Sequence, residues 1–416
     1  MRICRLFCRR IGHVSIFTAT LALACSLLLS ACASSGSQTL TIMTVFPTSG
    51  TDGALGLALQ QAVDLAVKQN ATLGGGYQLQ VEHVDEALGA PDQVVAGDIS
   101  EGGVIGVVGP FSSEVALAVA PVVERASVVT ISPTATLAGL TIADSAKAEG
   151  LDFTAIHPAG APIAFLRLPQ NSDAEGKAAA DLAVKASGGG LQAHNFSVVD
   201  DGSVSGKALA AAFIAELKAK GGSTLSHTSL AGGALSNPGA VVAKIVQDGP
   251  DAVFYAGDTL AGAQLRGALS SSGAPALPLL TVDPSANNPA WADAAGGALF
   301  AGATTGILAA QDLSKLTNAQ SFTSAYQSAY HSAPPPQAAL AYDAAMDEIT
   351  ALKAVLAAKK APTASAVLAG VTGAKYQGVT GSIAFDKNGD NNNAIPFSVY
   401  SCDDKGTWKL VGSIGG

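Results

Sequence analysis

Two clusters of small hydroxyl side chains follow apolar runs in the first third of the chain. Ser112 and Ser113 come directly after a Gly-Pro pair, and Thr134 and Thr136 end the stretch ISPTAT one helix and one strand later. Neutral hydroxyls beside the free backbone amides of a helix start can bind a carboxylate without burying a full countercharge. The same residue types also cap helices and form turns, so a purely structural role is the competing interpretation.

Three other ligand-binding patterns are incomplete. The segment GSVSGKA (202–208) has three residues before Gly-Lys instead of four and no Ser or Thr to hold magnesium, so we expect a strand-to-helix turn. The segment DKNGD (386–390) lacks the glycine and glutamate positions of a calcium loop, so we expect a turn of a hairpin. The six histidines show no His-x-x-x-His pair. We therefore expect no metal and no cofactor.

A serine esterase that uses Ser113 is an unfavoured alternative. The nucleophile elbow requires Gly-x-Ser-x-Gly, and FSSE (111–114) has no second glycine. Ser112 and Ser113 are instead expected to cap a helix over residues 114–126. The sequence thus favours a protein without enzyme activity.

The predicted elements place both hydroxyl clusters at the ends of strands. From residue 39, apolar runs alternate with amphipathic stretches, and the expected strands are 39–46, 78–84, 104–108 and 127–131. This alternation indicates a parallel sheet covered by helices on both faces. In such sheets, ligands bind beyond the carboxyl ends of the strands.

The same alternation begins again after a loop-like insertion at 140–162, which indicates a second α/β lobe. The last part of the chain differs. Helices at 319–331 and 338–358 suggest that the chain returns to the first lobe before it ends in the second. We expect a terminal β-hairpin from strands at 381–385 and 397–401.

The first 31 residues have the order of a secretory signal. Four arginines precede a short apolar stretch, which is followed by the small residues of Leu-Ser-Ala-Cys. This last motif resembles the bacterial lipobox, so we expect Cys32 to become the lipid-carrying first residue of the mature chain, with residues 32–38 as a tether. Without the four arginines, 19 basic residues oppose 32 acidic ones, a formal charge of −13 that argues against nucleic acid as a partner.

Together these features resemble the type I periplasmic binding proteins, and among them the branched-chain amino-acid binding proteins of ABC transporters. The resemblance rests on the lipobox, GPFSS (109–113), ISPTAT (131–136) and AYDA (341–344). It implies two Rossmann-like lobes joined by a three-segment hinge. The implied boundaries are 39–168 plus 307–380 for the first lobe and 169–306 plus 381–416 for the second.

The resemblance also implies roles for individual residues. In the first lobe, Ser113 and Thr136, with Ser112 beside them, would hold a ligand carboxylate, and the carbonyl of Thr134 would accept a hydrogen bond from its ammonium. In the second lobe, Val204 stands where the family has a tyrosine. Asp258 and Asp283 would form an acidic wall that favours a cationic or amine-bearing ligand, although Asp258 is equally well explained as a helix cap.

The function implied is that of a lipid-anchored binding protein on the outer face of the cytoplasmic membrane or in the periplasm. It would deliver an amino-acid-like ligand to an ABC transporter permease. A ligand sensor of the same fold is the alternative that one sequence leaves open. Ser113→Ala and Thr136→Val are expected to weaken binding of a carboxylate ligand strongly with little loss of folding stability.

Overall fold

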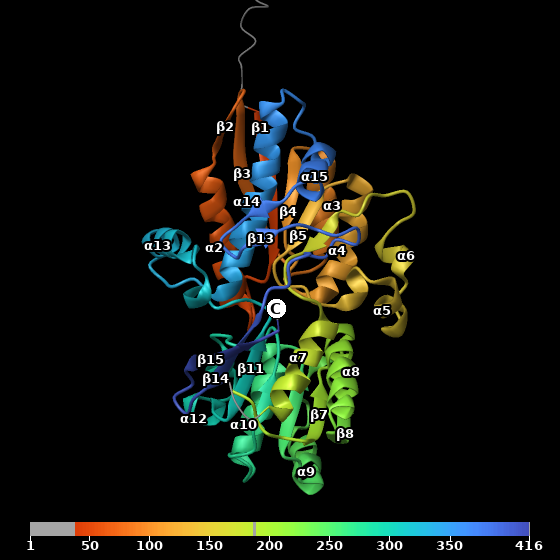
Figure 1. Ribbon diagram of the computed structural model, residues 1–416, viewed down its shortest axis with the longest axis vertical. Coiled ribbons are helices and arrows are strands. Elements are labelled where there is room, and N and C mark those ends of the chain that lie inside the picture. The colour runs from red at the N-terminus through yellow and green to blue at the C-terminus, as the bar shows by residue number, and fades with distance from the viewer. Residues whose placement is uncertain (1–37, 186–188, 416) are drawn as a thin grey trace, which may run out of the picture.

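The computed structural model describes residues 38–185 and 189–415, which form two α/β lobes stacked along the long axis (Figure 1). The first lobe contains a six-stranded sheet in the order β2-β3-β1-β4-β5-β6. The second contains a seven-stranded sheet in the order β15-β14-β11-β10-β9-β7-β8. The predicted fold of two α/β lobes is confirmed.

In the first lobe, the strands are β1 (Gln38–Phe46), β2 (Thr72–Gly74), β3 (Tyr77–Asp85), β4 (Val104–Val108), β5 (Val129–Ser132) and β6 (Phe165–Arg167). Its helices are α2 (Gly53–Gln69), α3 (Pro91–Glu101), α4 (Ser113–Ala126), α5 (Ala143–Ala148), α6 (Phe153–Ile156), α13 (Ala319–Tyr330), α14 (Pro336–Ala357) and α15 (Ala364–Thr372).

In the second lobe, the strands are β7 (Asn195–Asp200), β8 (Ser223–Ser229), β9 (Ala252–Ala256), β10 (Leu279–Thr281), β11 (Thr304–Leu308), β14 (Phe397–Cys402) and β15 (Trp408–Ile414). Its helices are α7 (Ser172–Val184), α8 (Val204–Ala219), α9 (Pro238–Asp248), α10 (Thr259–Ser271), α11 (Trp291–Ala294) and α12 (Ala298–Ala301). A short pair, β12 (Tyr376–Gln377) and β13 (Ser382–Ile383), precedes the last crossing between the lobes.

Strand β1 shows why helices cover both faces of the first sheet. Ile42 and Phe46 belong to the apolar core shared with α2, α14 and α15, whereas Met43 and Val45 pack with α3 and α4. Successive side chains of a strand point to opposite faces of its sheet. A central parallel strand with helices on both sides must therefore be apolar at consecutive positions, as this one is.

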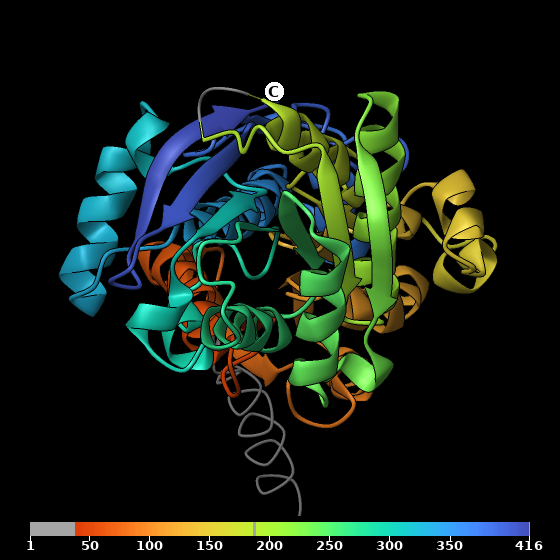
Figure 2. The same cartoon turned by 90° about the horizontal axis from the view of Figure 1, so that it is seen from below.

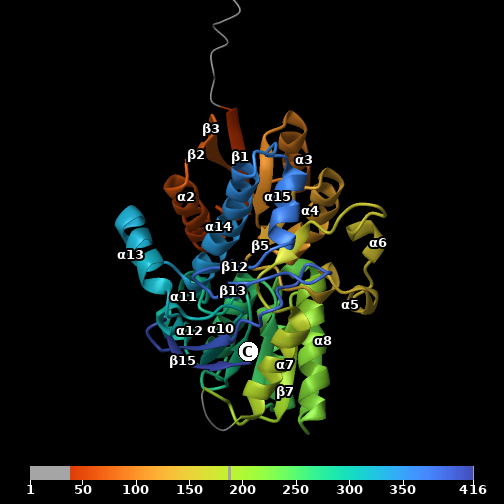
Figure 3. The same cartoon turned by 45° about the horizontal axis from the view of Figure 1, so that its top comes forward.

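The chain crosses between the lobes three times. After β6 it enters the second lobe, after β11 it returns to form α13, α14 and α15, and after β13 it ends in the second lobe as β14 and β15. Helices α14 and α15 lie side by side on the first sheet (Figure 3). Strands β14 and β15, dark blue, form one edge of the second sheet (Figure 2). The predicted boundary between 306 and 307 lies inside β11.

Two predictions about the connecting segments are wrong. The insertion at 140–162 is not a plain loop, because it contains α5 and α6, and His157 after α6 is hydrogen-bonded to Glu124 of α4 at 2.8 Å. The terminal hairpin is formed by β14 with β15, whereas β13 pairs with β12. Segment 386–391 instead runs beside the edge of the first sheet, where the amide of Arg167 donates to the carbonyl of Gly389 at 3.0 Å.

Cys402 is buried at the end of β14, in agreement with the interpretation of this residue as a small apolar side chain. Cys32 and the predicted signal lie outside the described residues. None of the helices in the described ranges is both long and apolar enough to cross a bilayer.

Candidate functional site

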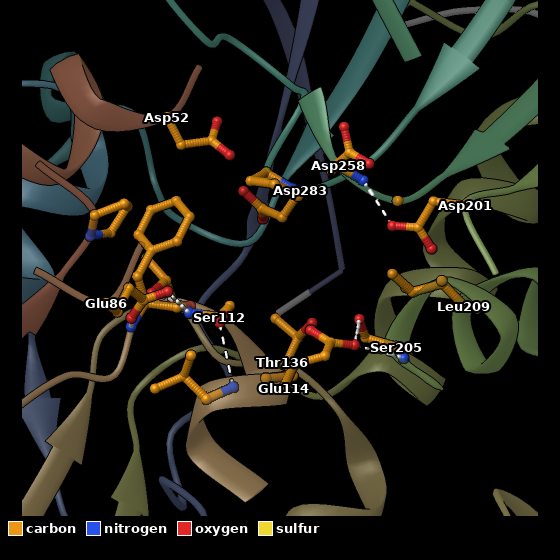
Figure 4. A pocket seen from close by; sticks show the side chains of 18 of the residues that line it. Asp52, Glu86, Ser112, Glu114, Thr136, Asp201, Ser205, Leu209, Asp258 and Asp283 are labelled. Atoms are coloured by element: carbon orange, nitrogen blue, oxygen red, sulfur yellow. Dashed lines mark hydrogen bonds between the residues drawn. The ribbon is translucent and has the colours of Figure 1, made fainter. Parts of the chain in front are cut away.

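A cavity of about 230 Å³ lies between the two lobes. Its first-lobe wall is built from the loops after β1, β3, β4 and β5, and its second-lobe wall from the loops after β7, β9 and β10. Figure 4 shows side chains from both lobes around this space. Since these loops follow the carboxyl ends of parallel strands, the cavity occupies the position where open α/β sheets bind ligands.

The predicted first-lobe residues all line the cavity: Ser112, Ser113, Thr134 and Thr136. Ser112 is the N-cap of α4, and its hydroxyl accepts a hydrogen bond from the amide of Val115 at 3.3 Å. The hydroxyl of Ser113 accepts from the amide of Leu137 at 3.1 Å. The hydroxyl of Thr134 donates to the carbonyl of Phe111 at 2.8 Å. These bonds join the two predicted loops into one surface.

Ser132 and Arg167 support this surface from the protein interior, and both side chains are fully buried. The Ser132 hydroxyl donates to the carbonyl of Pro110 at 2.7 Å. The guanidinium of Arg167 donates to the carbonyls of Thr136 at 3.0 Å and Leu137 at 2.6 Å. Arg167 was not predicted, because its partners come together only in the folded chain.

Glu86, which follows β3, was also not predicted. Its carboxylate accepts hydrogen bonds from the amides of Phe111 at 2.7 Å and Ser112 at 3.0 Å. Burial raises the pKa of Glu86 to about 7, although these hydrogen bonds act in the opposite direction. A carboxylate of the protein itself therefore occupies amides beside the start of α4, where a bound anion was expected.

In the second lobe, Asp258 and Asp283 line the cavity. Asp258 also caps α10, since its carboxylate accepts from the amide of Ala261 at 2.8 Å, so both interpretations of this residue apply. The carboxylate of Asp283 accepts from the amide of Ala309 at 2.5 Å. Burial raises the pKa of Asp258 above its ordinary value and that of Asp283 to about 7.

Val204 is not among the residues that line the cavity, whereas Ser205 and Gly206 are. Val204 is the first residue of α8 and packs against an apolar cluster that includes Ala116 of α4. Consecutive helical residues differ by about 100° in direction, so the cleft position falls to Ser205. Val204, predicted at the ligand site, therefore faces away from the cavity, and its neighbour Ser205 lines it.

Hydrogen bonds cross the cleft on both sides of the cavity. On one side, Asp52 of the first lobe accepts from Thr259 and from Asn288, each at 2.7 Å. On the other, the carboxylate of Glu114 accepts from the hydroxyl of Ser205 at 2.6 Å, as Figure 4 shows. The lobes are thus held together around the cavity by hydrogen bonds, and the participating residues Asp52, Glu114 and Ser205 also line it.

The cavity wall is strongly acidic. Its carboxylates are those of Asp52, Glu86, Glu114, Asp201, Asp258 and Asp283, and no Lys, Arg or His is found among the described residues that line it. Within the described ranges, no group of three or more His, Cys, Asp and Glu side chains is arranged to hold a metal ion. The polar groups of this site can therefore accept hydrogen bonds and attract positive charge.

Residues 39–407 match the model of a family described as periplasmic binding protein. Over 272 residues, the chain is 29% identical to the Leu/Ile/Val-binding protein BraC3 of Rhizobium johnstonii. The aligned region covers 64% of this chain and 68% of that protein.

Solved structures share the fold. One is the branched-chain amino acid transporter substrate binding protein LivJ of Streptococcus pneumoniae in complex with isoleucine, with a TM-score of 0.74 and 22% identity over 91% of this chain and 99% of that one. Another is an ABC transporter solute binding protein of R. palustris in complex with benzoate, with a TM-score of 0.71 and 20% identity over 90% of this chain and 96% of that one.

Proposed function

Because this chain belongs to the periplasmic binding protein family, we propose that it is the extracytoplasmic substrate-binding lipoprotein of an ABC transporter. It binds an amino acid or an amino-acid-like small molecule between its lobes and delivers it to a membrane permease. Lipid attached at Cys32 holds it at the membrane. The name of the Rhizobium relative and the isoleucine complex of LivJ support the ligand class.

The observation that carries this proposal is the cavity whose wall is shared by both lobes. A ligand can favour the closed arrangement only if it binds that arrangement better than the open one. Contacts to both lobes provide this difference, and a three-segment hinge permits the movement. Binding and closure are therefore one event, which a permease can recognise.

The test uses the mature chain without its lipid, residues 33–416. A thermal-shift screen with amino acids, amides, amines and small aromatic acids identifies compounds that raise the unfolding temperature, since a ligand of the native state stabilises it by mass action. Small-angle X-ray scattering then measures the radius of gyration with and without each hit. We expect a stabilising compound that also compacts the protein. Stabilisation by no compound of any class, and no compaction, would rule out the proposed function.

A further inference from the structure

The side chains of the cavity wall indicate which class of ligand the cavity binds, whereas the position of the cavity indicates only that it binds one. We propose that the ligand is a small organic cation with two separated amine or guanidinium groups and without a carboxylate. This inference rests on the proposed function, because it assumes that the protein takes its ligand in the inter-lobe cavity.

Positive charge is the first requirement. All six ionisable side chains of the cavity wall are carboxylates, and none of the described lining residues is basic. In a partly desolvated cavity, such groups attract a cation more strongly than they would in water. Each of the six carboxylates already accepts a hydrogen bond from the protein. The lining residues supply no positive charge, which a cation provides and which the carboxylate of a zwitterion would offset.

The arrangement of the carboxylates indicates that the ligand carries two separated positive charges. Asp52 and Glu86 belong to the first lobe, whereas Asp201 and Asp258 belong to the second and are joined by a hydrogen bond of 2.9 Å from the Asp258 amide. Glu86 lies at one side of the cavity and the Asp201–Asp258 pair at the other (Figure 4). A molecule with a positive group near each end therefore contacts both lobes through charge.

A ligand carboxylate is disfavoured because the Glu86 carboxylate lies beside its expected position. The amides of Phe111 and Ser112 donate to Glu86, and the hydroxyl of Ser113 accepts from Leu137. An additional carboxylate at this end would lie beside Glu86, and two like charges at such a distance repel. Glu86 thus occupies the Ser112 end of the carboxylate site predicted from the sequence.

The apolar part of the cavity wall suits a methylene chain. Pro47 and Phe111 line the cavity from the first lobe and Leu209 from the second. Aliphatic stems of long amines pack on such surfaces while their charged ends reach polar groups. The length of the chain is limited by the cavity volume of about 230 Å³.

Matched pairs of compounds test the inference. Isothermal titration of residues 33–416 compares agmatine with arginine and cadaverine with lysine, which differ only in the α-carboxylate, and includes leucine and calcium chloride. We expect an amine without the carboxylate to bind at least about tenfold more tightly than its parent amino acid, and leucine to bind more weakly still.

Each other result has a defined meaning. If arginine, lysine or leucine binds as tightly as the amines, the inference is wrong and the proposed function stands. If calcium binds and no amine does, the inference is also wrong. If nothing in this panel binds, the inference is wrong, and the proposed function fails as well only when the wider thermal-shift screen also finds no stabilising compound.

A charge variant gives an independent check. Glu86→Gln is expected to weaken binding of the tightest amine by about tenfold. The control Asp404→Asn removes the same charge from an exposed position between β14 and β15 and should leave the affinity unchanged. If Glu86→Gln does not fold, the salt dependence of the wild-type protein replaces it. Raising the ionic strength must then weaken amine binding, and salt-independent binding contradicts the inference.

Discussion

The Asp52 carboxylate, at the start of α2 in the first lobe, accepts a hydrogen bond of 2.7 Å from the Thr259 hydroxyl, at the start of α10 in the second. The side-chain amide of Asn288 donates to the same oxygen, also at 2.7 Å. Burial raises the pKa of Asp52, and these two hydrogen bonds partly oppose that rise. Since Asp52 also lines the cavity, one side chain couples ligand binding to lobe closure.

Asp52→Ala is expected to weaken ligand binding by about a hundredfold or more, because hydrogen bonds to a charged group contribute about 1.5–3 kcal/mol each and both cross the cleft. Ligand-induced compaction, measured by small-angle scattering, should decrease in parallel. The matched variant Asp52→Asn retains one acceptor oxygen for both donors and should close more readily than the alanine variant. Full compaction of Asp52→Ala would show that this contact does not hold the lobes together.

Ser205 and Val204 allow the two sides of α8 to be compared at neighbouring positions. The Ser205 hydroxyl donates to Glu114 across the cleft, whereas Val204 packs in an apolar cluster. Ser205→Ala should reduce ligand affinity several-fold, since an exposed hydrogen bond contributes about 1 kcal/mol at most. Val204→Ala should mainly lower stability. Calorimetric titration and denaturant unfolding of both variants separate the effects, and equal affinity losses would contradict the assignment.

Much of the fold could be predicted because the apolar patterns are strong. Strand β4 has the predicted limits and helix α4 begins one residue earlier than predicted, since a strand buried on both faces and an amphipathic helix leave distinct patterns. The terminal hairpin could not be predicted correctly. The carboxylate of Asp386 accepts from the amides of Asn388 and Asp390 and closes a local turn, so the chain leaves this segment beside Arg167 and not as a strand partner.

The site was predictable only where the residues themselves lie at strand ends. Ser113 and Asp283 line the cavity as expected from their positions in the chain. Glu86 and Asp52 also follow or precede regular elements, but one carboxylate at such a position is common in loops and does not by itself indicate a site. The partners of Glu86 lie in the loop after β4 and those of Asp52 in the other lobe, and local periodicity does not indicate contacts between such distant segments.

Ser113 contributes more to folding stability than its position in the sequence indicates. Its hydroxyl accepts from the amide of Leu137, which is itself buried. Ser113→Ala is therefore expected to lower the free energy of unfolding by about 1–3 kcal/mol, the cost of leaving a buried donor without a partner. This revises the expectation that truncation here would leave stability unaffected. Urea unfolding measures the change, and Ser112→Ala, which removes a helix cap worth about 1 kcal/mol, is the comparison. An unchanged midpoint for Ser113→Ala would show that the Leu137 amide finds another partner.

The raised pKa of Glu86 predicts how stability depends on pH. The folded value is about 7 against an ordinary value of 4.5, with burial as the main cause and the charge of Asp52 adding to it. Between these values the native state holds a proton that the unfolded chain has released, so the free energy of unfolding falls as pH rises through this window and levels off above it.

Glu86→Gln should make this slope shallower. Burial also raises the pKa of Asp283 and of Asp347 to about 7. These two groups contribute in the same direction in both proteins, so the comparison isolates Glu86. Thermal unfolding from pH 4.5 to 8 measures both curves.

A cation bound beside Glu86 should favour its ionised form, so amine binding at pH 6 should release protons, which titration in two buffers of different ionisation enthalpy detects. Parallel pH curves for the two proteins, together with binding that releases no protons, would place the ionised cation partner elsewhere in the cavity.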